Sequence, residues 1–324
     1  MASIPAPVLV LGSVLSIQFG QALGKTLFAS VGPEGAVALR LGLAAVILCA
    51  VHRPALPRTG RGLTVVLGFG TAIAGMNLIY PALTYLPLGL AASLQLLGPI
   101  TLALATSRRR LDVVLAATAG VGVWLFHGAQ GESFSLPGVL LALASGVSMA
   151  AYLLLSRRAG AAHAGTAPLA LAVAWAAVLT VPWGVVVNGA ALLEPAVLGT
   201  GAVVAVLSAV LPYSLELVAL RRLPPRTVGV MQSLEPAMAG VAGTVVLAEH
   251  LRAVQWLGLG CVSLASAGTV ALGRGRGRRS EDVAAASAGT GARTYARGQP
   301  PSDGGSSRER DPRRRHGCRR HPHR

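Results

Sequence analysis

Two glutamates lie in apolar stretches where a charged side chain is costly. Glu216 is part of LPYSLELVAL, and Glu235 stands directly before Pro236 in SLEPAMAG. A carboxylate in such surroundings is stable only when it is paired, hydrated or protonated. Glu235 is therefore a candidate for carrying a proton or for neutralising a bound amine. The alternative is a neutral structural acid that is hydrogen-bonded to its neighbours.

Glu216 has two possible roles. It lies about one turn from Arg221 and Arg222, so an ion pair with these arginines is a sufficient explanation. Alternatively, Glu216 lines an inner vestibule together with Tyr213 and Ser214, beside the kink expected at Pro212, and supports proton coupling.

Two prolines follow glutamines at the same spacing. A proline inside a helix has no N–H to donate to the carbonyl four residues earlier. For Pro99 that carbonyl belongs to Gln95, and for Pro236 it belongs to Gln232. Each glutamine thus combines a side-chain amide with a free carbonyl, which suits binding of an ammonium or hydroxyl group. Two helix breaks that serve only packing are the alternative.

The first apolar stretch carries three polar residues on one helical face. Gln18, Gln21 and Lys25 are three and four residues apart, so a helix would turn them to the same side. We expect both glutamines to contact a substrate. Lys25 and Arg40 could each bind a carboxylate, although Lys25 could instead extend to the membrane surface and Arg40 could belong to a structural ion pair.

Polar residues also occur in the third and sixth apolar stretches. Asn77 and Tyr152 are predicted to line a cavity, whereas Tyr80, Ser145 and Ser148 are typical of hydrogen bonds between helices.

Known catalytic and metal-binding patterns are absent from the sequence. It has no phosphate-binding glycine loop, no nucleophile elbow and no metal-ligand cluster, and its three cysteines are far apart. We expect neither enzymatic activity nor a metal or cofactor.

Composition indicates which elements position these residues. Of 324 residues, 53% are hydrophobic and only 12% are charged, far from the composition of a soluble domain. The net charge of +16 does not indicate a nucleic-acid-binding protein, because half of the 28 basic residues follow residue 272 and no aromatic residues alternate with them. The lipid bilayer is the expected surrounding.

Ten apolar stretches are long enough to cross a bilayer as helices. They cover residues 6–28, 35–52, 63–84, 88–106, 111–127, 137–156, 167–187, 197–219, 227–248 and 254–272. The predicted fold is an all-α integral membrane protein with ten transmembrane helices.

The loops predict the orientation. Even-numbered loops carry eleven arginines, whereas odd-numbered loops carry only Arg252. Basic residues remain on the cytoplasmic side, so both termini are expected in the cytoplasm. The eleven are Arg53, Arg58, Arg61, Arg108, Arg109, Arg110, Arg157, Arg158, Arg221, Arg222 and Arg226.

The two halves resemble each other. The segment from Tyr85 aligns with the segment from Arg222 at a constant offset of 137 residues, which matches Gln95 with Gln232 and Pro99 with Pro236. Five spans per half make the second copy inverted, as in many secondary transporters. We predict one repeat over residues 1–130 and a second over 131–272. Residues 273–324 form a predicted disordered basic tail that can touch anionic lipids.

Several of these motifs together resemble the drug/metabolite transporter superfamily, namely its ten-helix carriers of two EamA-type repeats. The similar segments include SIQFGQALGKTLF, GMNLIYPALTYLPLGLAASLQLLGP, LPYSLELVALRRLPPRT and SLEPAMAG, within residues 5–272. Within the superfamily the sequence is most similar to the branch that exports threonine and homoserine across the bacterial inner membrane.

The resemblance implies a function. It implies export of small neutral amino acids from the cytoplasm by alternating access, driven by proton antiport, with the proton gradient as the energy source. Two alternatives remain. One is export of other small metabolites or drugs, and the other is a membrane scaffold or sensor, for which deletion of residues 273–324 would abolish function.

Overall fold

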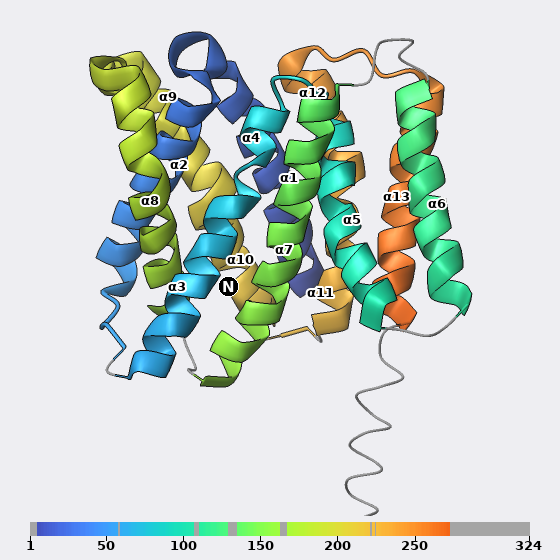
Figure 1. The fold of residues 1–324 in the computed structure, drawn as a ribbon, viewed down its shortest axis with the longest axis horizontal. Coiled ribbons are helices and arrows are strands. Elements are labelled where there is room, and N and C mark those ends of the chain that lie inside the picture. Colours follow the sequence, from blue (N-terminus) through green and yellow to red (C-terminus); the bar gives the residue numbers. More distant parts are fainter. Residues whose placement is uncertain are drawn as a thin grey trace, which may run out of the picture. The chain divides into compact units, whose positions relative to one another are not determined.

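The computed structural model describes residues 5–57, 59–106, 110–128, 135–162, 167–220, 222–223 and 225–272, and all regular secondary structure among them is helical (Figure 1). The α-helices are α1 Ala6–Thr26, α2 Phe28–His52, α3 Gly60–Met76, α4 Ile79–Ala82, α5 Leu88–Thr106, α6 Arg110–Gly128, α7 Leu136–Ala162, α8 Ala167–Asn188, α9 Pro195–Ala205, α10 Leu211–Leu220, α11 Pro225–Gln232, α12 Glu235–Leu247 and α13 Ala253–Leu272. A 3₁₀ turn, η1, covers Gly189–Leu193, and a π-helical turn, η2, covers Val206–Val210.

Eight helical segments within the described residues are long and apolar enough to span a membrane. Each lies at a predicted span. The predicted fourth and fifth spans also hold helices, but their apolar parts, Leu88–Leu102 and Val113–Phe126, are shorter. The prediction of an all-helical membrane protein is therefore confirmed, while the count of ten crossings remains a prediction.

Three of the spanning segments are interrupted along their length. The third breaks at Asn77 and Leu78, between α3 and α4, and the ninth breaks at Ser233 and Leu234, between α11 and α12. In the eighth, η2 inserts a π-helical turn between α9 and α10. Such interruptions expose main-chain carbonyls inside the bundle, where other side chains can bind them.

The helix break that was predicted at Pro99 is not found. Pro99 lies inside the continuous helix α5. The glycines of α5 and α7 bring the two backbones into contact, so that a Cβ added to Gly146 would lie 2.6 Å from the Gln95 carbonyl oxygen. Packing against α7 thus supports α5 across the proline. At Pro236 the prediction holds, because the chain is interrupted just before α12.

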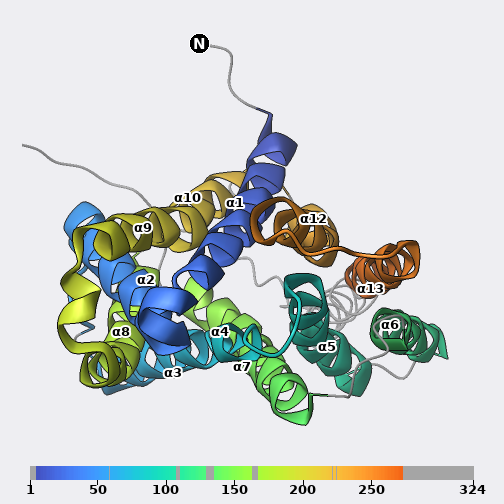
Figure 2. The same ribbon diagram turned by 90° about the horizontal axis from the view of Figure 1, so that it is seen from above.

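The helices pack mainly across the two halves of the chain. Figure 2 shows α1 between α10 and α12, while α7 lies between α3 and α5. Helix α2 packs on α8 and α9, α5 on α12, and α6 on α13. The core therefore consists of interfaces between the first and second halves.

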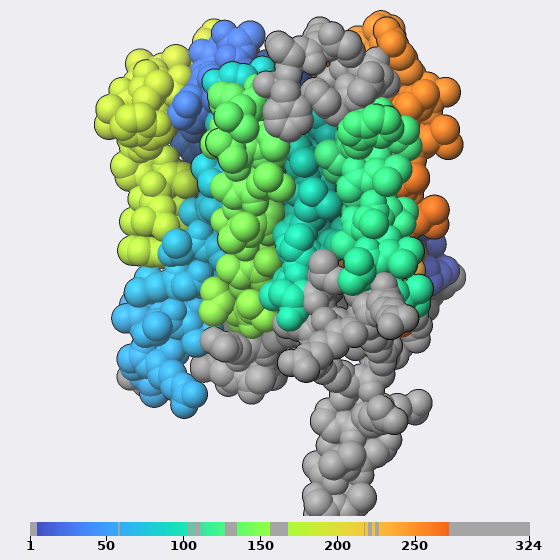
Figure 3. All heavy atoms as spheres, turned by 45° about the vertical axis from the view of Figure 1, so that its right-hand side comes forward, coloured from blue at the N-terminus to red at the C-terminus, as the bar shows by residue number. Residues whose placement is uncertain are grey.

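Apolar side chains cover the outside of the bundle. Figure 3 shows one face, on which α7, α5 and α6 lie next to one another. Exposed large apolar side chains on α6 and α7 include Val113, Val121, Trp124, Leu140, Val147 and Leu154. Their exposure is expected for helices that contact lipid, because lipid tails are as apolar as these side chains.

Candidate functional site

Arg40 is the most deeply placed basic side chain whose contacts are described, with 8% of its surface exposed. It projects from the middle of α2. Its Nε donates to the Ser208 hydroxyl at 2.7 Å and its Nη2 to the Ser208 carbonyl at 2.9 Å. Its Nη1 donates to the side-chain oxygen of Asn77. The guanidinium also lies 5.6 Å from the ring centre of Tyr80. All of these partners are neutral.

No acidic side chain among the described residues forms an ion pair with Arg40. The described contacts of Arg40 therefore do not include the structural ion pair that was the predicted alternative. A buried cation whose hydrogen bonds are partly satisfied but whose charge is not neutralised favours binding of an anion.

Irregular backbone supplies the partners of Arg40. Pro212 lacks the N–H that would bond the carbonyl four residues earlier, which is that of Ser208. In η2, the Leu211 N–H bonds instead to the Val206 carbonyl, five residues back. The Ser208 carbonyl is thereby available to Arg40. Asn77 lies at the break that ends α3.

Glu216 bonds neutral side chains from two other helices. Its carboxylate accepts a hydrogen bond from Ser13 of α1 at 3.2 Å and one from Gln232 of α11 at 2.8 Å. Of the two arginines considered as ion-pair partners of Glu216, Arg221 lies outside the described residues. The side chain points toward α1 and α11.

Glu235 occupies the first turn of α12, directly after the break in the ninth segment. The residue is 9% exposed, and its carboxylate has no hydrogen-bond partner among the described residues. Its charge interacts with that of Glu216. Glu216 is half-buried and Glu235 is buried, so the two carboxyl groups are costly to ionise together.

The glutamines of α1 are buried as predicted. Gln18 is 2% exposed and Gln21 is 7% exposed. The side-chain oxygens of both are enclosed and accept no hydrogen bond from any described residue. Buried acceptors without donors are rare in proteins, and a bound ligand that donates hydrogen bonds is one explanation.

Gln95 and Tyr152 have protein partners. The Gln95 amide nitrogen donates to Ser145 of α7 at 2.6 Å and to the Met76 carbonyl at 3.3 Å. Tyr152 stacks on Phe69 of α3, with ring centres 5.0 Å apart. The observed contacts of Gln95 are therefore those of a side chain that joins α3, α5 and α7.

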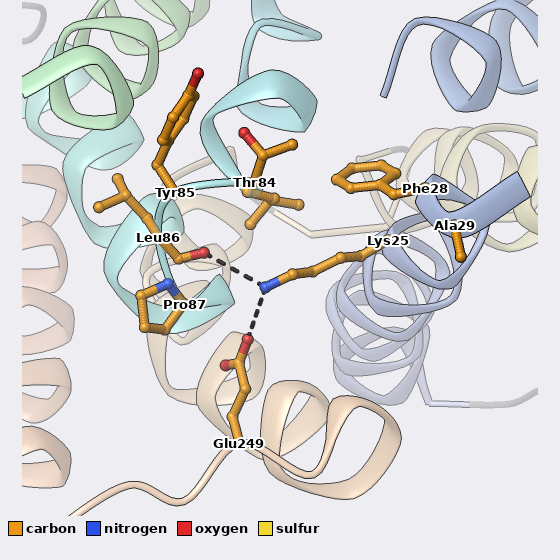
Figure 4. Close-up of a pocket in the computed structure, with 9 residues that line it drawn as sticks. Lys25, Phe28, Ala29, Thr84, Tyr85, Leu86, Pro87 and Glu249 are labelled. Carbon is orange, nitrogen blue, oxygen red and sulfur yellow. Dashed lines mark hydrogen bonds and ion pairs between the residues drawn. The ribbon is translucent and has the colours of Figure 1, made fainter. Parts of the chain in front are cut away.

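Lys25 forms an ion pair that the sequence did not suggest. Its Nζ lies 3.1 Å from the Glu249 carboxylate and 3.5 Å from the Leu86 carbonyl oxygen (Figure 4). Glu249 also accepts from the Leu88 backbone N–H at 3.2 Å. The pair joins the end of α1 to the start of α5 and the segment after α12. It lines an open cavity of about 560 Å³ with Phe28, Ala29, Leu83, Thr84, Tyr85, Leu86 and Pro87.

The predicted residues thus fall into separate groups. Arg40 and Asn77 meet, as do Glu216 and Gln232, and Glu235 lies within electrostatic range of Glu216. Lys25 belongs to the cavity at one end of the bundle, and Glu235 does not line that cavity. Within the described residues no group of three or more His, Cys, Asp or Glu could hold a metal ion.

Three residues of these contacts were not predicted from the sequence, namely Ser208, Ser13 and Glu249. The proline rule applied to Pro99 and Pro236 would also have identified the Ser208 carbonyl, four residues before Pro212. No local pattern marks Ser13 or Glu249, because their partners are about 200 residues away in the chain.

Comparison with known proteins assigns the family. A profile of the EamA-like transporter family matches residues 136–271. The chain is 41% identical over 266 residues to the threonine/homoserine exporter RhtA of Escherichia coli strain K12, covering 81% of this chain and 90% of that protein. It is 42% identical over 268 residues to the RhtA of Salmonella typhimurium strain LT2, with the same coverage.

The fold also has a solved counterpart. One crystal structure is 20% identical and superimposes with a TM-score of 0.56 over 82% of this chain and 98% of that chain, which shows a shared fold. The curated relatives are exporters rather than enzymes. The chain is therefore a multi-pass membrane transporter that belongs to the EamA-like family of the drug/metabolite transporter superfamily.

Proposed function

We propose that this protein exports small neutral amino acids of the threonine and homoserine type from the bacterial cytoplasm in exchange for protons. The observation that carries the proposal is Glu235, a buried carboxylate at a broken membrane helix that accepts no hydrogen bond from any described residue. The two RhtA relatives, which are named as threonine/homoserine exporters, supply the substrate class.

Glu235 couples substrate and proton by competition. A carboxylate that binds an ammonium group cannot hold a proton at the same time. Protonation from outside therefore releases the amino acid, and loss of the proton to the cytoplasm restores the binding state. Glu216 supports this exchange, because its charge makes simultaneous ionisation of both acids unfavourable.

The other polar groups complete the binding site. Arg40 binds the substrate carboxylate, since no protein carboxylate among the described residues neutralises it. Gln18 and Gln21 accept hydrogen bonds from the ammonium or hydroxyl group, because their side-chain oxygens have no donor. Gln95, Gln232, Asn77 and Tyr152 complete the proposed set of substrate-binding residues, and the hydrogen bonds and the ring stacking already described position them.

Alternating access follows from two inverted repeats of five spans. The helix contacts support this architecture, because each contact of a helix in one half has a counterpart at the equivalent helix of the other half. Helix α1 lies between α10 and α12 as α7 lies between α3 and α5, and the pairs α2 with α8, α5 with α12, and α6 with α13 join equivalent helices. The repeats occupy residues 1–130 and 131–272.

The orientation follows from the arginine asymmetry of the loops, which supports cytoplasmic termini in the inner membrane. The energy source is the proton gradient, with no cofactor. The basic tail, residues 273–324, can bind anionic lipids.

The first experiment measures efflux of radiolabelled threonine and homoserine from preloaded cells, with and without a collapsed proton gradient. In Glu235→Gln, gradient-dependent efflux falls at least about tenfold, equivalent to ~1.4 kcal/mol of lost coupling. Glu194→Gln is the matched control, because Glu194 is exposed before α9. Gradient-dependent efflux at the wild-type rate in Glu235→Gln would exclude Glu235 as the proton carrier.

The same assay tests the alternatives. No efflux of either amino acid by well-expressed wild type would contradict the substrate assignment and favour another metabolite. A variant that ends at residue 272 keeps its transport activity if the protein is a carrier, whereas a scaffold that works through its tail loses its function.

A further inference from the structure

Arg40 is held by one residue from each half of the chain. Asn77 lies at the break between α3 and α4, and Ser208 lies in the π-helical turn η2. Asn77 is 4% exposed and Ser208 is 2% exposed, so both contacts with Arg40 are shielded from solvent. The two irregular segments therefore converge on a single guanidinium group.

Both acceptors are fixed in the same manner. The Asn77 amide nitrogen donates to the Ile73 carbonyl at 2.8 Å, and the Ser208 hydroxyl donates to the Val204 carbonyl at 2.6 Å. Each bond runs to the carbonyl four residues earlier. Because the donor atom of each side chain is occupied, its oxygen lone pairs are directed at Arg40, which can only donate.

The hydrogen-bond inventory of Arg40 is incomplete. A guanidinium group has five N–H donors. Three are used by the Asn77 side chain, the Ser208 hydroxyl and the Ser208 carbonyl. Within the part of the chain that the structure describes, the other two N–H donors have no acceptor and the positive charge has no acidic partner.

We propose that Asn77 and Ser208 are positioning residues that make the site selective for a carboxylate. This inference rests on the proposed function and deepens it. By supplying neutral acceptors in place of acidic ones, they hold the guanidinium rigidly without neutralising it. A substrate carboxylate then accepts hydrogen bonds from the two remaining N–H donors and is attracted by the full positive charge. An amine without a carboxylate has neither interaction.

Neutrality at position 77 is the feature that can be tested. The substitution Asn77→Asp keeps the size of the side chain and its oxygen toward Arg40, but it adds an internal carboxylate. The protein would then neutralise its own arginine, and an external carboxylate would compete with Asp for it.

The test compares L-threonine with L-threoninol, which has an alcohol in place of the carboxylate. In transport, Asn77→Asp raises the KM for L-threonine about tenfold or more and leaves Vmax within about twofold. Competition by L-threoninol stays the same or becomes stronger. A merely structural role for Asn77 would instead change both compounds alike and lower Vmax.

Asn188→Asp is the matched control. Asn188 also donates its amide to the carbonyl four residues earlier, that of Gly184, at 3.0 Å, but it does not contact Arg40. The Asn188→Asp substitution should leave the preference for L-threonine over L-threoninol at the wild-type value. Ser208→Ala, which retains the carbonyl bond to Arg40, should lower the preference for L-threonine less than Asn77→Asp does.

Thermal stabilisation of the purified protein gives a readout that needs no transport. L-threonine should raise the melting temperature of wild type and of Asn188→Asp but not of Asn77→Asp, and L-threoninol should stabilise Asn77→Asp at least as much as the other two proteins. An equal response to L-threonine in wild type and Asn77→Asp would overturn the inference. Wild type that binds but does not export L-threonine would contradict the proposed function alone.

Discussion

Polar side chains inside this transporter differ in whether other protein groups form hydrogen bonds with them. Glu216 accepts hydrogen bonds from Ser13 and Gln232, while Glu235 accepts none from the described residues. The two glutamates thus differ in their hydrogen-bond partners as well as in their sequence surroundings. Glu216 joins α1, α10 and α11, and Glu235 is left available for a ligand or a proton.

Substitution of Glu216 should separate its charge from its hydrogen bonds. Glu216→Gln keeps an oxygen that accepts from Gln232, so the melting temperature should stay close to that of wild type. Glu216→Leu leaves Ser13 and Gln232 without their shared partner, which costs about 1–3 kcal/mol of stability. Thermal unfolding of the purified proteins measures the difference. Equal melting temperatures for both variants would show that these bonds do not stabilise the fold.

At the scale of helices, glycines and interruptions determine how closely elements approach. Gly98 and Gly146 put the backbones of α5 and α7 in contact, and a Cβ on Gly122 of α6 would lie 2.6 Å from the Gly258 carbonyl of α13. Small residues at helix interfaces are the usual source of packing energy in membranes, where no hydrophobic force drives association.

Gly98→Ala should therefore destabilise the protein. The new methyl group would collide with the Gly146 carbonyl, which cannot move without shifting α7, and overpacking of this kind costs about 1–3 kcal/mol or more. Gly260→Ala in α13 is the control, because nothing lies within 4 Å of a Cβ added there. Detergent-solubilised Gly98→Ala should unfold at a lower temperature than both Gly260→Ala and wild type. A melting temperature that matches the control would argue against the tight contact.

For the whole molecule, the ion pair of Lys25 and Glu249 connects the two halves at one end of the bundle. It joins α1 of the first half to the segment after α12 of the second, and both side chains are partly buried, at 24% and 14% exposure. If the halves move relative to each other during transport, this contact must separate once in each cycle.

A reversible cross-link tests this movement. Lys25→Cys and Glu249→Cys are combined in a background where Cys49, Cys261 and Cys318 are alanine, and the two thiols are bridged with a bifunctional methanethiosulfonate. Efflux should fall to nearly zero and recover after reduction of the bridge. Each single cysteine variant treated with the same reagent is the control. Undiminished efflux by the cross-linked protein would show that Lys25 and Glu249 stay together throughout transport.

Much of the fold was predictable because its signals are local. Bilayer crossing requires long apolar helices, and these stand out in composition without any knowledge of partners. The break before Pro236 and the depth of Glu235 also followed from neighbouring residues. Pro212 and Pro81 carried further local information, since each removes an N–H from a carbonyl four residues earlier, Ser208 in one case and Asn77 in the other.

The sequence by itself determined that this chain is a helical membrane protein with polar groups placed along its apolar segments. Only the tertiary structure decided the partners of those groups. Arg40 contacts Ser208 across 168 residues, Glu216 contacts Ser13 across 203, and Lys25 contacts Glu249 across 224. The physical reason is that a helix satisfies its own backbone locally, whereas a polar side chain in lipid is satisfied only by whichever helix packs against it.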